Sequence, residues 1–292
     1  MTATDITLLK RWPTQLLDRV ASKNFVLVVG AGISRGCTNT VGKSPPSWSE
    51  LIHDLAKTFT TGMVKKTVLE LAGHGRYLDA AELLRGRARI QAREEDFLQR
   101  IADVTDGGRK PADQYQPSEL HETLLELEPD VLVTTNYDRI LERATKNGYN
   151  LHSYDSTTLS RDVRLGMPVL IKIHGSVDSA REIVLTRSDY TRLRRQGAQV
   201  LEVLQSLFLT KTALFVGYSF SDPDIHLLLE NVLGARGDVQ AHYLLTSGSV
   251  PLHLREIYQY CYGTAAVTYS SGDYMEMRRM LELLGQQVAA RR

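Results

Sequence analysis

Phe25-Val26-Leu27-Val28-Val29-Gly30-Ala31-Gly32-Ile33-Ser34 is the stretch from which the fold of this chain can be predicted. Its first five residues are apolar, rich in β-branched side chains and too few for a helix of ordinary length, so they predict a strand buried on both faces. The glycines that follow let the backbone turn tightly and approach a ligand closely, because no Cβ stands in the way. Exposed backbone N–H groups in such a turn suit the phosphates of a nucleotide.

Three later stretches have the same form, a short apolar run that ends in small or polar residues. They are Val131–Thr134 followed by Thr135-Asn136-Tyr137-Asp138, Pro168–Ile173 followed by His174-Gly175, and Ala213–Val216 followed by Gly217-Tyr218-Ser219-Phe220. Residues His242–Leu245 and Ala266–Tyr269 predict two further strands, and Glu182–Leu185 a short added one. Strands that alternate with helices predict a mostly parallel, doubly wound α/β sheet of Rossmann-like form. Ligands bind at the carboxyl ends of the strands in such a sheet, so all four turns are expected to line one cleft.

Helical patterns fill the segments between these strands. Ser47-Trp48-Ser49-Glu50 has the pattern of a capping box and predicts the start of a helix. From Met63 to about Val104 the pattern stays helical and highly charged. We therefore predict a helical insertion, or small lobe, at about residues 49–127, within a single domain that covers residues 1–292.

The composition excludes several classes of protein. The 35 Lys and Arg residues nearly balance the 34 Asp and Glu residues, so the net charge of +1 gives no attraction towards nucleic acid or an anionic membrane. Two cysteines, Cys37 and Cys261, cannot form a disulfide framework or a four-thiolate zinc site. Met1–Asp5 lacks a basic start followed by an apolar core, and no apolar run approaches bilayer length. We expect a soluble, cytoplasmic protein.

Taken in order, the four turns resemble the motifs of the sirtuin (silent information regulator) superfamily, whose fold cleaves NAD. The glycine motif resembles Gly30–Ser34, the Asn-x-Asp motif that handles the nicotinamide ribose resembles Asn136 to Asp138, the catalytic histidine motif resembles His174-Gly175, and the Gly-x-Ser motif that contacts the rest of the dinucleotide resembles Gly217-Tyr218-Ser219. The resemblance extends over roughly residues 20–270. It implies that NAD is bound at these turns.

The chain departs from the protein-deacylating sirtuins in two places. Those proteins usually carry a zinc ribbon of two Cys-x-x-Cys motifs after the histidine, but here no cysteine lies between Cys37 and Cys261. Their Pro-Asp-Phe-Arg segment is replaced by Arg35-Gly36-Cys37-Thr38. The stretches Pro46–Leu51 and Gly217–Asp224 resemble instead the zinc-free bacterial branch, which contains NAD-degrading effectors of antiphage defence. The resemblance therefore implies NAD hydrolysis, with no metal.

The resemblance also implies which residues do the work. Asn136 and His174 are expected to be catalytic, because a side-chain amide can hold ribose hydroxyls or a water and an imidazole can take a proton near neutral pH. The residues expected to bind the dinucleotide are Gly30, Ala31, Gly32, Ser34, Thr135, Asp138, Gly217, Ser219 and Phe220. Some of these have simpler explanations: Asp138 could be a helix N-cap, and Ser219 and Phe220 could be loop packing.

A dehydrogenase is the alternative that the glycine turn alone would suggest. Glu50 lies 20 positions after Gly30, where a dehydrogenase places its ribose-binding acid. The pattern around Glu50 starts a helix, however, and the next glycine after Gly32 is Gly36, one position too late for the dinucleotide fingerprint. An oxidoreductase is therefore disfavoured.

We thus expect an NAD hydrolase that releases nicotinamide and ADP-ribose and depletes NAD in antiphage defence. Two alternatives stay open, namely an NAD-dependent deacylase or ADP-ribosyltransferase, and a nucleotide-binding regulatory subunit that is inactive without a partner. The family resemblance further implies a homo-oligomer whose activity is gated, with a HerA-type hexameric ATPase as a partner for stand-alone domains of this size. The sequence gives no reason to expect direct binding of nucleic acid.

Overall fold

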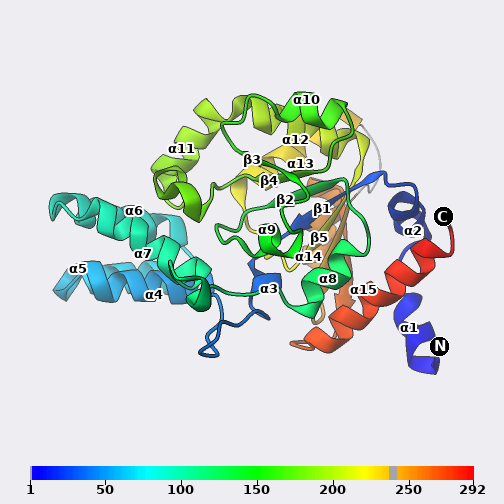
Figure 1. The fold of residues 1–292 in the computed structure, drawn as a ribbon, viewed down its shortest axis with the longest axis horizontal. Coiled ribbons are helices and arrows are strands. Elements are labelled where there is room, and N and C mark those ends of the chain that lie inside the picture. Colours follow the sequence, from blue (N-terminus) through cyan, green and yellow to red (C-terminus); the bar gives the residue numbers. More distant parts are fainter. Residues whose placement is uncertain (1, 237–241) are drawn as a thin grey trace.

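A single sheet of parallel strands organises the computed structural model, which describes residues 2–236 and 242–292 (Figure 1). Over these residues the sheet has seven strands in the order β3-β4-β2-β1-β5-β6-β7. Their bounds are β1 Phe25–Val29, β2 Val131–Thr134, β3 Asn150–Ser153, β4 Val169–Lys172, β5 Thr212–Val216, β6 His242–Ser247 and β7 Thr264–Tyr269. Every neighbouring pair of strands is parallel. The predicted doubly wound α/β sheet is confirmed.

The strand predictions were wrong in two places. The strand β3 was not predicted, because Asn150-Leu151-His152-Ser153 is short and half polar and its first two residues are exposed at the edge of the sheet. Glu182–Leu185 is not a strand: Glu182 is the last residue of a 3₁₀ segment, η2 (Val177–Glu182), and residues 183–185 have no regular structure. Ile183 and Leu185 are buried among helices rather than in the sheet.

Helices cover both faces of the sheet, and the strands β1, β2, β4 and β5 are buried along their whole length (Figure 1). One face packs against α1 (Ala3–Leu9), α2 (Thr14–Ala21), α8 (Glu119–Leu125) and α15 (Tyr274–Ala289). The other face packs against α10 (Leu159–Arg164), α11 (Arg187–Gln196), α12 (Ala198–Thr210) and α13 (Pro223–Arg236). Burial of apolar side chains in these two layers is the main source of stability for such a fold.

The segment between β1 and β2 forms its own helical cluster, which projects to the left in Figure 1. Its helices are α4 (Trp48–Phe59), α5 (Gly62–Gly73), α6 (Tyr77–Ile90) and α7 (Glu94–Asp106). Helix α4 begins with the predicted capping box, in which Ser47 and Glu50 accept each other's backbone N–H groups. The core of this cluster also includes Tyr137, which reaches it from the turn after β2.

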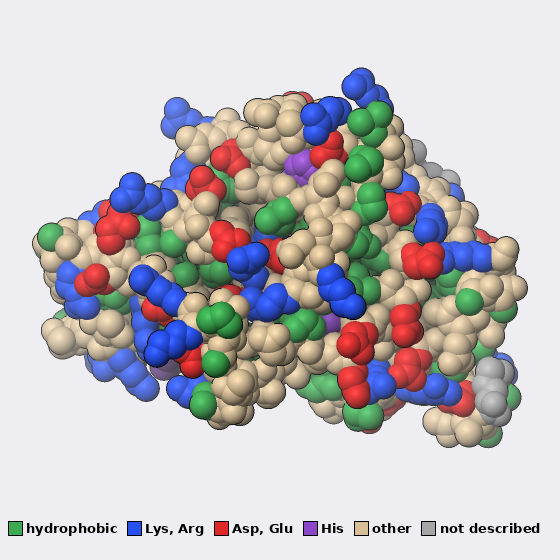
Figure 2. Space-filling model, viewed as in Figure 1, with side chains coloured by type: hydrophobic (Ala, Val, Ile, Leu, Met, Phe, Trp, Pro, Cys, Tyr) green, Lys and Arg blue, Asp and Glu red, His purple; other side chains and the backbone are tan. Residues whose placement is uncertain are grey.

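Charges of both signs are interspersed over the surface seen in Figure 2, in keeping with the near balance of acidic and basic residues. Within residues 2–236 and 242–292, no helix is both long and apolar enough to cross a membrane.

Candidate functional site

The four turns singled out in the sequence begin at the same edge of the sheet. The pairing register aligns Val29 with Thr134 and Val216, and Thr134 with Lys172, so the strands β1, β2, β4 and β5 end level with one another. Asn136 and His174 each lie two residues beyond the aligned residues Thr134 and Lys172, on neighbouring strands. The prediction that these turns share the carboxyl edge of the sheet is confirmed.

The glycines of the first and fourth turns pack directly against each other. The backbone N–H of Gly32 donates to the carbonyl oxygen of Gly217 at 2.8 Å. A Cβ on Gly30 would lie 2.5 Å from the same carbonyl oxygen, and Gly217 itself has a φ of +61°, which disfavours any side chain. The lack of side chains thus lets two turns interlock, a role that we had not predicted from the sequence.

Replacing Gly32 by alanine is expected to destabilise the fold by about 1–3 kcal/mol, as overpacking does in a close-packed interior. The new Cβ would lie 2.8 Å from the Gly217 carbonyl oxygen and 2.9 Å from its Cα, and neither backbone atom can move away freely. Thermal unfolding measures the loss. Gly86→Ala is the matched control, because that position in α6 faces open space and alanine favours a helix. Equal stability of the two variants would contradict the interlocked turns.

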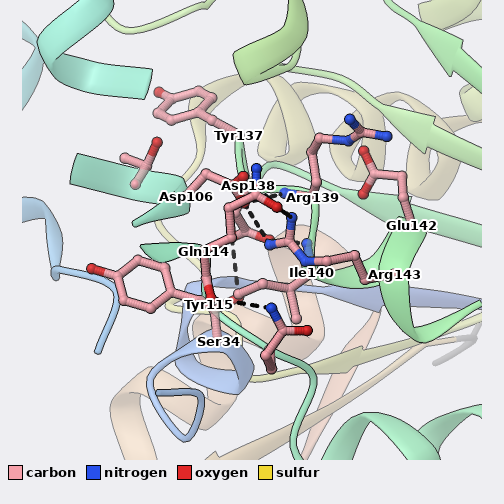
Figure 3. Close-up of polar contacts among 12 residues, drawn as sticks. Ser34, Asp106, Gln114, Tyr115, Tyr137, Asp138, Arg139, Ile140, Glu142 and Arg143 are labelled. Carbon is pink, nitrogen blue, oxygen red and sulfur yellow. Dashed lines mark hydrogen bonds and ion pairs between the residues drawn. The ribbon is translucent and has the colours of Figure 1, made fainter. Parts of the chain in front are cut away.

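The Asn136 side chain is held by a hydrogen-bonded chain that joins the first two turns. Its Nδ2 donates to the Ser34 hydroxyl at 3.1 Å. That hydroxyl donates to Oδ2 of Asp138 at 3.2 Å, and Figure 3 labels both of these residues. All three side chains are buried. The bond to Ser34 uses one of the two Nδ2 protons, so the carbonyl oxygen and the second N–H of the Asn136 amide are left to meet a ligand. Ser34, predicted to bind the dinucleotide, positions Asn136 in this structure.

The Asp138 carboxyl has a second partner at the start of α9 (Ile140–Ala144), although the N-cap residue of that helix is Arg139 and not Asp138. Its Oδ1 accepts the backbone N–H of Ile140, the first residue of α9. Burial raises the pKa of this carboxyl to about 6, against the lowering effect of the Lys172 charge and the Ile140 N–H. Asp138 therefore carries a carboxylate whose charge is costly to bury and is compensated only in part.

His174 has a carboxylate partner that we had not predicted from the sequence. Its Nε2 lies 3.1 Å from Oδ2 of Asp222, and the Tyr190 hydroxyl donates to the same oxygen at 2.7 Å. The Tyr190 ring also packs edge-on against the imidazole, with centroids 5.1 Å apart. Since Nε2 faces the carboxylate, Nδ1 is the ring nitrogen left for proton transfer.

Asp222 is fixed by the helix that follows it. Its Oδ1 accepts the backbone N–H groups of Asp224 and Ile225 in the first turn of α13. Burial would raise its pKa, but the charge of His174 at ion-pair distance, together with the hydrogen bonds from Ile225 and Tyr190, outweighs burial and lowers the pKa to about 2. The only signal in the sequence was Ser221-Asp222-Pro223, which predicts a helix start and says nothing of the histidine.

The other residues predicted to contact the dinucleotide fall into two groups. Ala31 and Ser219 are exposed and Thr135 is half-buried, so all three lie at the accessible side of the edge. Phe220 is different: its ring is buried against Phe215, Tyr218 and Tyr258. Its side chain therefore packs in the core, and a ligand there would meet only its backbone. Among the described residues, no three His, Cys, Asp or Glu side chains gather as metal ligands do.

Together these contacts make a site with two oriented polar side chains. A buried amide is held by Ser34, and a buried imidazole is held by Asp222. An imidazole backed by a carboxylate can accept a proton and stabilise the resulting charge. An amide carbonyl at the same edge of the sheet can orient a hydroxyl group or a water molecule.

Comparisons with known proteins point to one group. Residues 130–263 match the family model described as SIR2-like domain. The chain is 28% identical over 234 residues to the NAD(+) hydrolase ThsA of Bacillus cereus (strain MSX-D12). This match covers 77% of this chain and 44% of that protein. It is 26% identical over 237 residues to the NAD(+) hydrolase ThsA of Enterococcus faecium, covering 78% of this chain and 44% of that protein.

A shorter match joins this chain to Defense-associated sirtuin 2 of Bacillus subtilis, with 25% identity over 113 residues, 38% of this chain and 11% of that protein. The chain thus spans less than half the length of the curated relatives that it matches.

Proposed function

We propose that this chain hydrolyses NAD to nicotinamide and ADP-ribose, because its residues 130–263 match the SIR2-like domain model and it is similar to NAD(+) hydrolases and to a defence-associated sirtuin. The observation that carries the proposal is the common sheet edge at which Asn136 and the His174–Asp222 contact occur. The reaction is proposed from the names of the relatives, which are NAD(+) hydrolases. The arrangement of these side chains gives a chemical reason why this chain could catalyse it.

The reaction needs little acid catalysis, since nicotinamide in NAD is already a cationic leaving group. The glycosidic C–N bond breaks, its electron pair leaves with nicotinamide, and positive charge develops on the ribose. A water oxygen then bonds to the same ribose carbon and gives its proton to the site. The task of the protein is to orient the sugar and the water and to stabilise the developing charge.

In this proposal His174 takes the proton at Nδ1 while Asp222 stabilises the imidazolium through Nε2. The Asn136 carbonyl oxygen orients a ribose hydroxyl or the water. The turns at Gly30–Gly32 and at Gly217, with Thr135 and Ser219, contact the rest of the dinucleotide through backbone groups and exposed side chains. No metal takes part.

The wider setting is also part of the proposal. We propose that residues 1–292 form one NAD-binding domain with residues 49–127 as its insertion, and that it acts in the cytoplasm as a homo-oligomer that depletes NAD in antiphage defence. A HerA-type ATPase is the partner proposed to gate it. Light scattering of the pure chain, alone and mixed with such an ATPase, tests both assemblies. A chain that is monomeric and does not bind the ATPase would exclude both the homo-oligomer and the complex.

The purified chain is expected to release nicotinamide and ADP-ribose in equal amounts from NAD, because hydrolysis divides the dinucleotide into these two products. Chromatography of the reaction, with and without a HerA-type ATPase, measures both. An acetylated peptide added in a parallel reaction separates hydrolysis from deacylation, which would yield the deacetylated peptide and the acetylated sugar product. NAD that stays intact in every mixture would refute the proposed activity.

A further inference from the structure

Lys172 is a fully buried lysine at the end of β4, two residues before His174. Its ammonium group donates to the backbone carbonyl of Tyr137 at 3.2 Å, to the backbone carbonyl of Asp138, and to Oε1 of Glu142 at 2.8 Å. An ammonium has three protons to donate, so these three acceptors satisfy it completely. Two of the three belong to the turn that carries Asn136 and Asp138.

The contact with Glu142 does not by itself explain why a lysine is buried here. Only one Glu142 oxygen is engaged, since its Oε2 is buried without a hydrogen-bond partner. Burying two charges is costly, and a well-packed apolar pair of similar volume is often as stable or more stable. The distinctive property of Lys172 is therefore its two bonds to backbone carbonyls, which no apolar side chain could replace.

Those two bonds fix one end of the turn, and other contacts fix the rest. At its start the backbone N–H of Asn136 donates to the Thr134 hydroxyl. At its end the backbone N–H of Arg139 donates to Oδ1 of Asp106, which lies on the opposite side of the turn from Glu142 in Figure 3. In the middle, directly after Asn136, Lys172 donates to both carbonyls. The Tyr137 carbonyl also accepts the backbone N–H of Val177 at 3.0 Å, so the Asp138 carbonyl is the one that depends most on Lys172.

We propose that Lys172 is a positioning residue: its ammonium holds the peptide groups at Tyr137 and Asp138 so that the Asn136 amide is aimed at the bound sugar. The expected effect on catalysis rests on the proposed NAD hydrolysis. The expected effect on the rigidity of the turn rests only on the hydrogen bonds that Lys172 donates. Lys172 does not touch the substrate, since it is enclosed by protein on all sides.

Two variants separate positioning from simple stability. Lys172→Met leaves Glu142 as an unpaired buried charge and is expected to lower the Tm far below that of the wild type. The double variant Lys172→Met/Glu142→Leu removes both charges and is expected to recover most of the wild-type Tm. If Lys172 positions the turn, kcat of the double variant stays about 10²-fold below wild type while KM changes little, because a small misalignment acts mainly on the transition state.

Arg279→Met is the matched control, because Arg279 also bonds a buried carboxylate, that of Asp5, on helices that carry no residue of the site. It is expected to lower Tm and leave kcat unchanged. Hydrogen exchange gives a readout that does not need activity: residues 135–142 of the double variant should exchange faster than in the wild type, while the strand at residues 25–29 should not change.

The outcomes are distinguishable. A double variant that regains both Tm and wild-type kcat, with unchanged exchange at residues 135–142, would overturn the positioning role and leave NAD hydrolysis intact. A wild-type chain that releases no nicotinamide would refute the proposed activity, and the exchange measurement would then decide alone whether Lys172 orders the turn.

Discussion

Replacing His174 by alanine is expected to lower kcat for NAD hydrolysis by about 10²–10⁴-fold, the range typical of a lost general base. The imidazole is buried, faces a carboxylate through Nε2 and leaves Nδ1 for the proton of the attacking water. Alanine removes that acceptor but not the turns proposed to hold the dinucleotide, so the affinity for NAD should change far less than kcat. Nicotinamide release and calorimetric binding of NAD measure the two effects separately.

Controls for this prediction come from the same chain. His253→Ala removes an exposed histidine from α14 (Leu252–Tyr262) and should keep full activity. Asn136→Ala is expected to lose about 10²–10⁴-fold in kcat as well, because the water or ribose hydroxyl loses its orienting carbonyl. Wild-type turnover by a folded His174→Ala protein would refute its proposed role as base.

Asp222→Asn is expected to lower kcat by about 10²–10⁴-fold although the new side chain has nearly the same shape. The amide carries no negative charge to stabilise an imidazolium, and its NH₂ group can turn the histidine into the wrong tautomer, as in other carboxylate–imidazole sites. The Asn oxygen can still accept the N–H groups at the start of α13, which limits the effect on folding. A kcat profile from pH 5 to 9 measures the loss.

The stability of Asp222→Asn has its own pH dependence. Because the Asp222 pKa is lowered to about 2 from its ordinary value of 3.8, the carboxylate stabilises the folded state above pH 3.8, and this contribution is lost as the pH falls through 2. The stability difference between wild type and variant should therefore be full at neutral pH and vanish in strong acid. Tyr190→Phe is the graded control, since it removes one hydrogen bond and leaves the charge. If Asp222→Asn and Tyr190→Phe had equal and small effects on kcat, the charge of Asp222 would have no catalytic role.

The parts of the fold that could be predicted from the sequence are those with strong local signals. The strands β1, β2, β4 and β5 are apolar runs, and each is followed by a turn of small or polar residues. Gly30 and Gly217 are examples, because a side chain at either position would clash with the other turn. The edge strand β3 has no such signal, because a strand with one free edge needs few apolar residues. The apolar residues Ile183 and Leu185 were misleading, since they are buried among helices rather than in the sheet.

The site was predictable only in part, because only some of its residues have a strong local signal in the sequence. Asn136 and His174 stand out because polar residues directly follow buried strands. The role of Asp222 could not be predicted, since a helix start explains an aspartate before a proline and the distance to His174 depends on the folded chain. Lys172 looked like an ordinary strand residue, and its three acceptors come from a turn and a helix that lie 30 to 35 positions earlier in the chain.

Tyr137 stands between Asn136 and Asp138, yet its ring belongs to the core formed by α4–α7. Its hydroxyl donates to the backbone carbonyl of Val184 at 2.7 Å, in the segment that follows His174. One aromatic ring thus ties the outlying helices mechanically to both loops that carry the amide and the imidazole. A tilt of those helices would move the loops that carry Asn136 and His174, without any contact between the helices and the nucleotide.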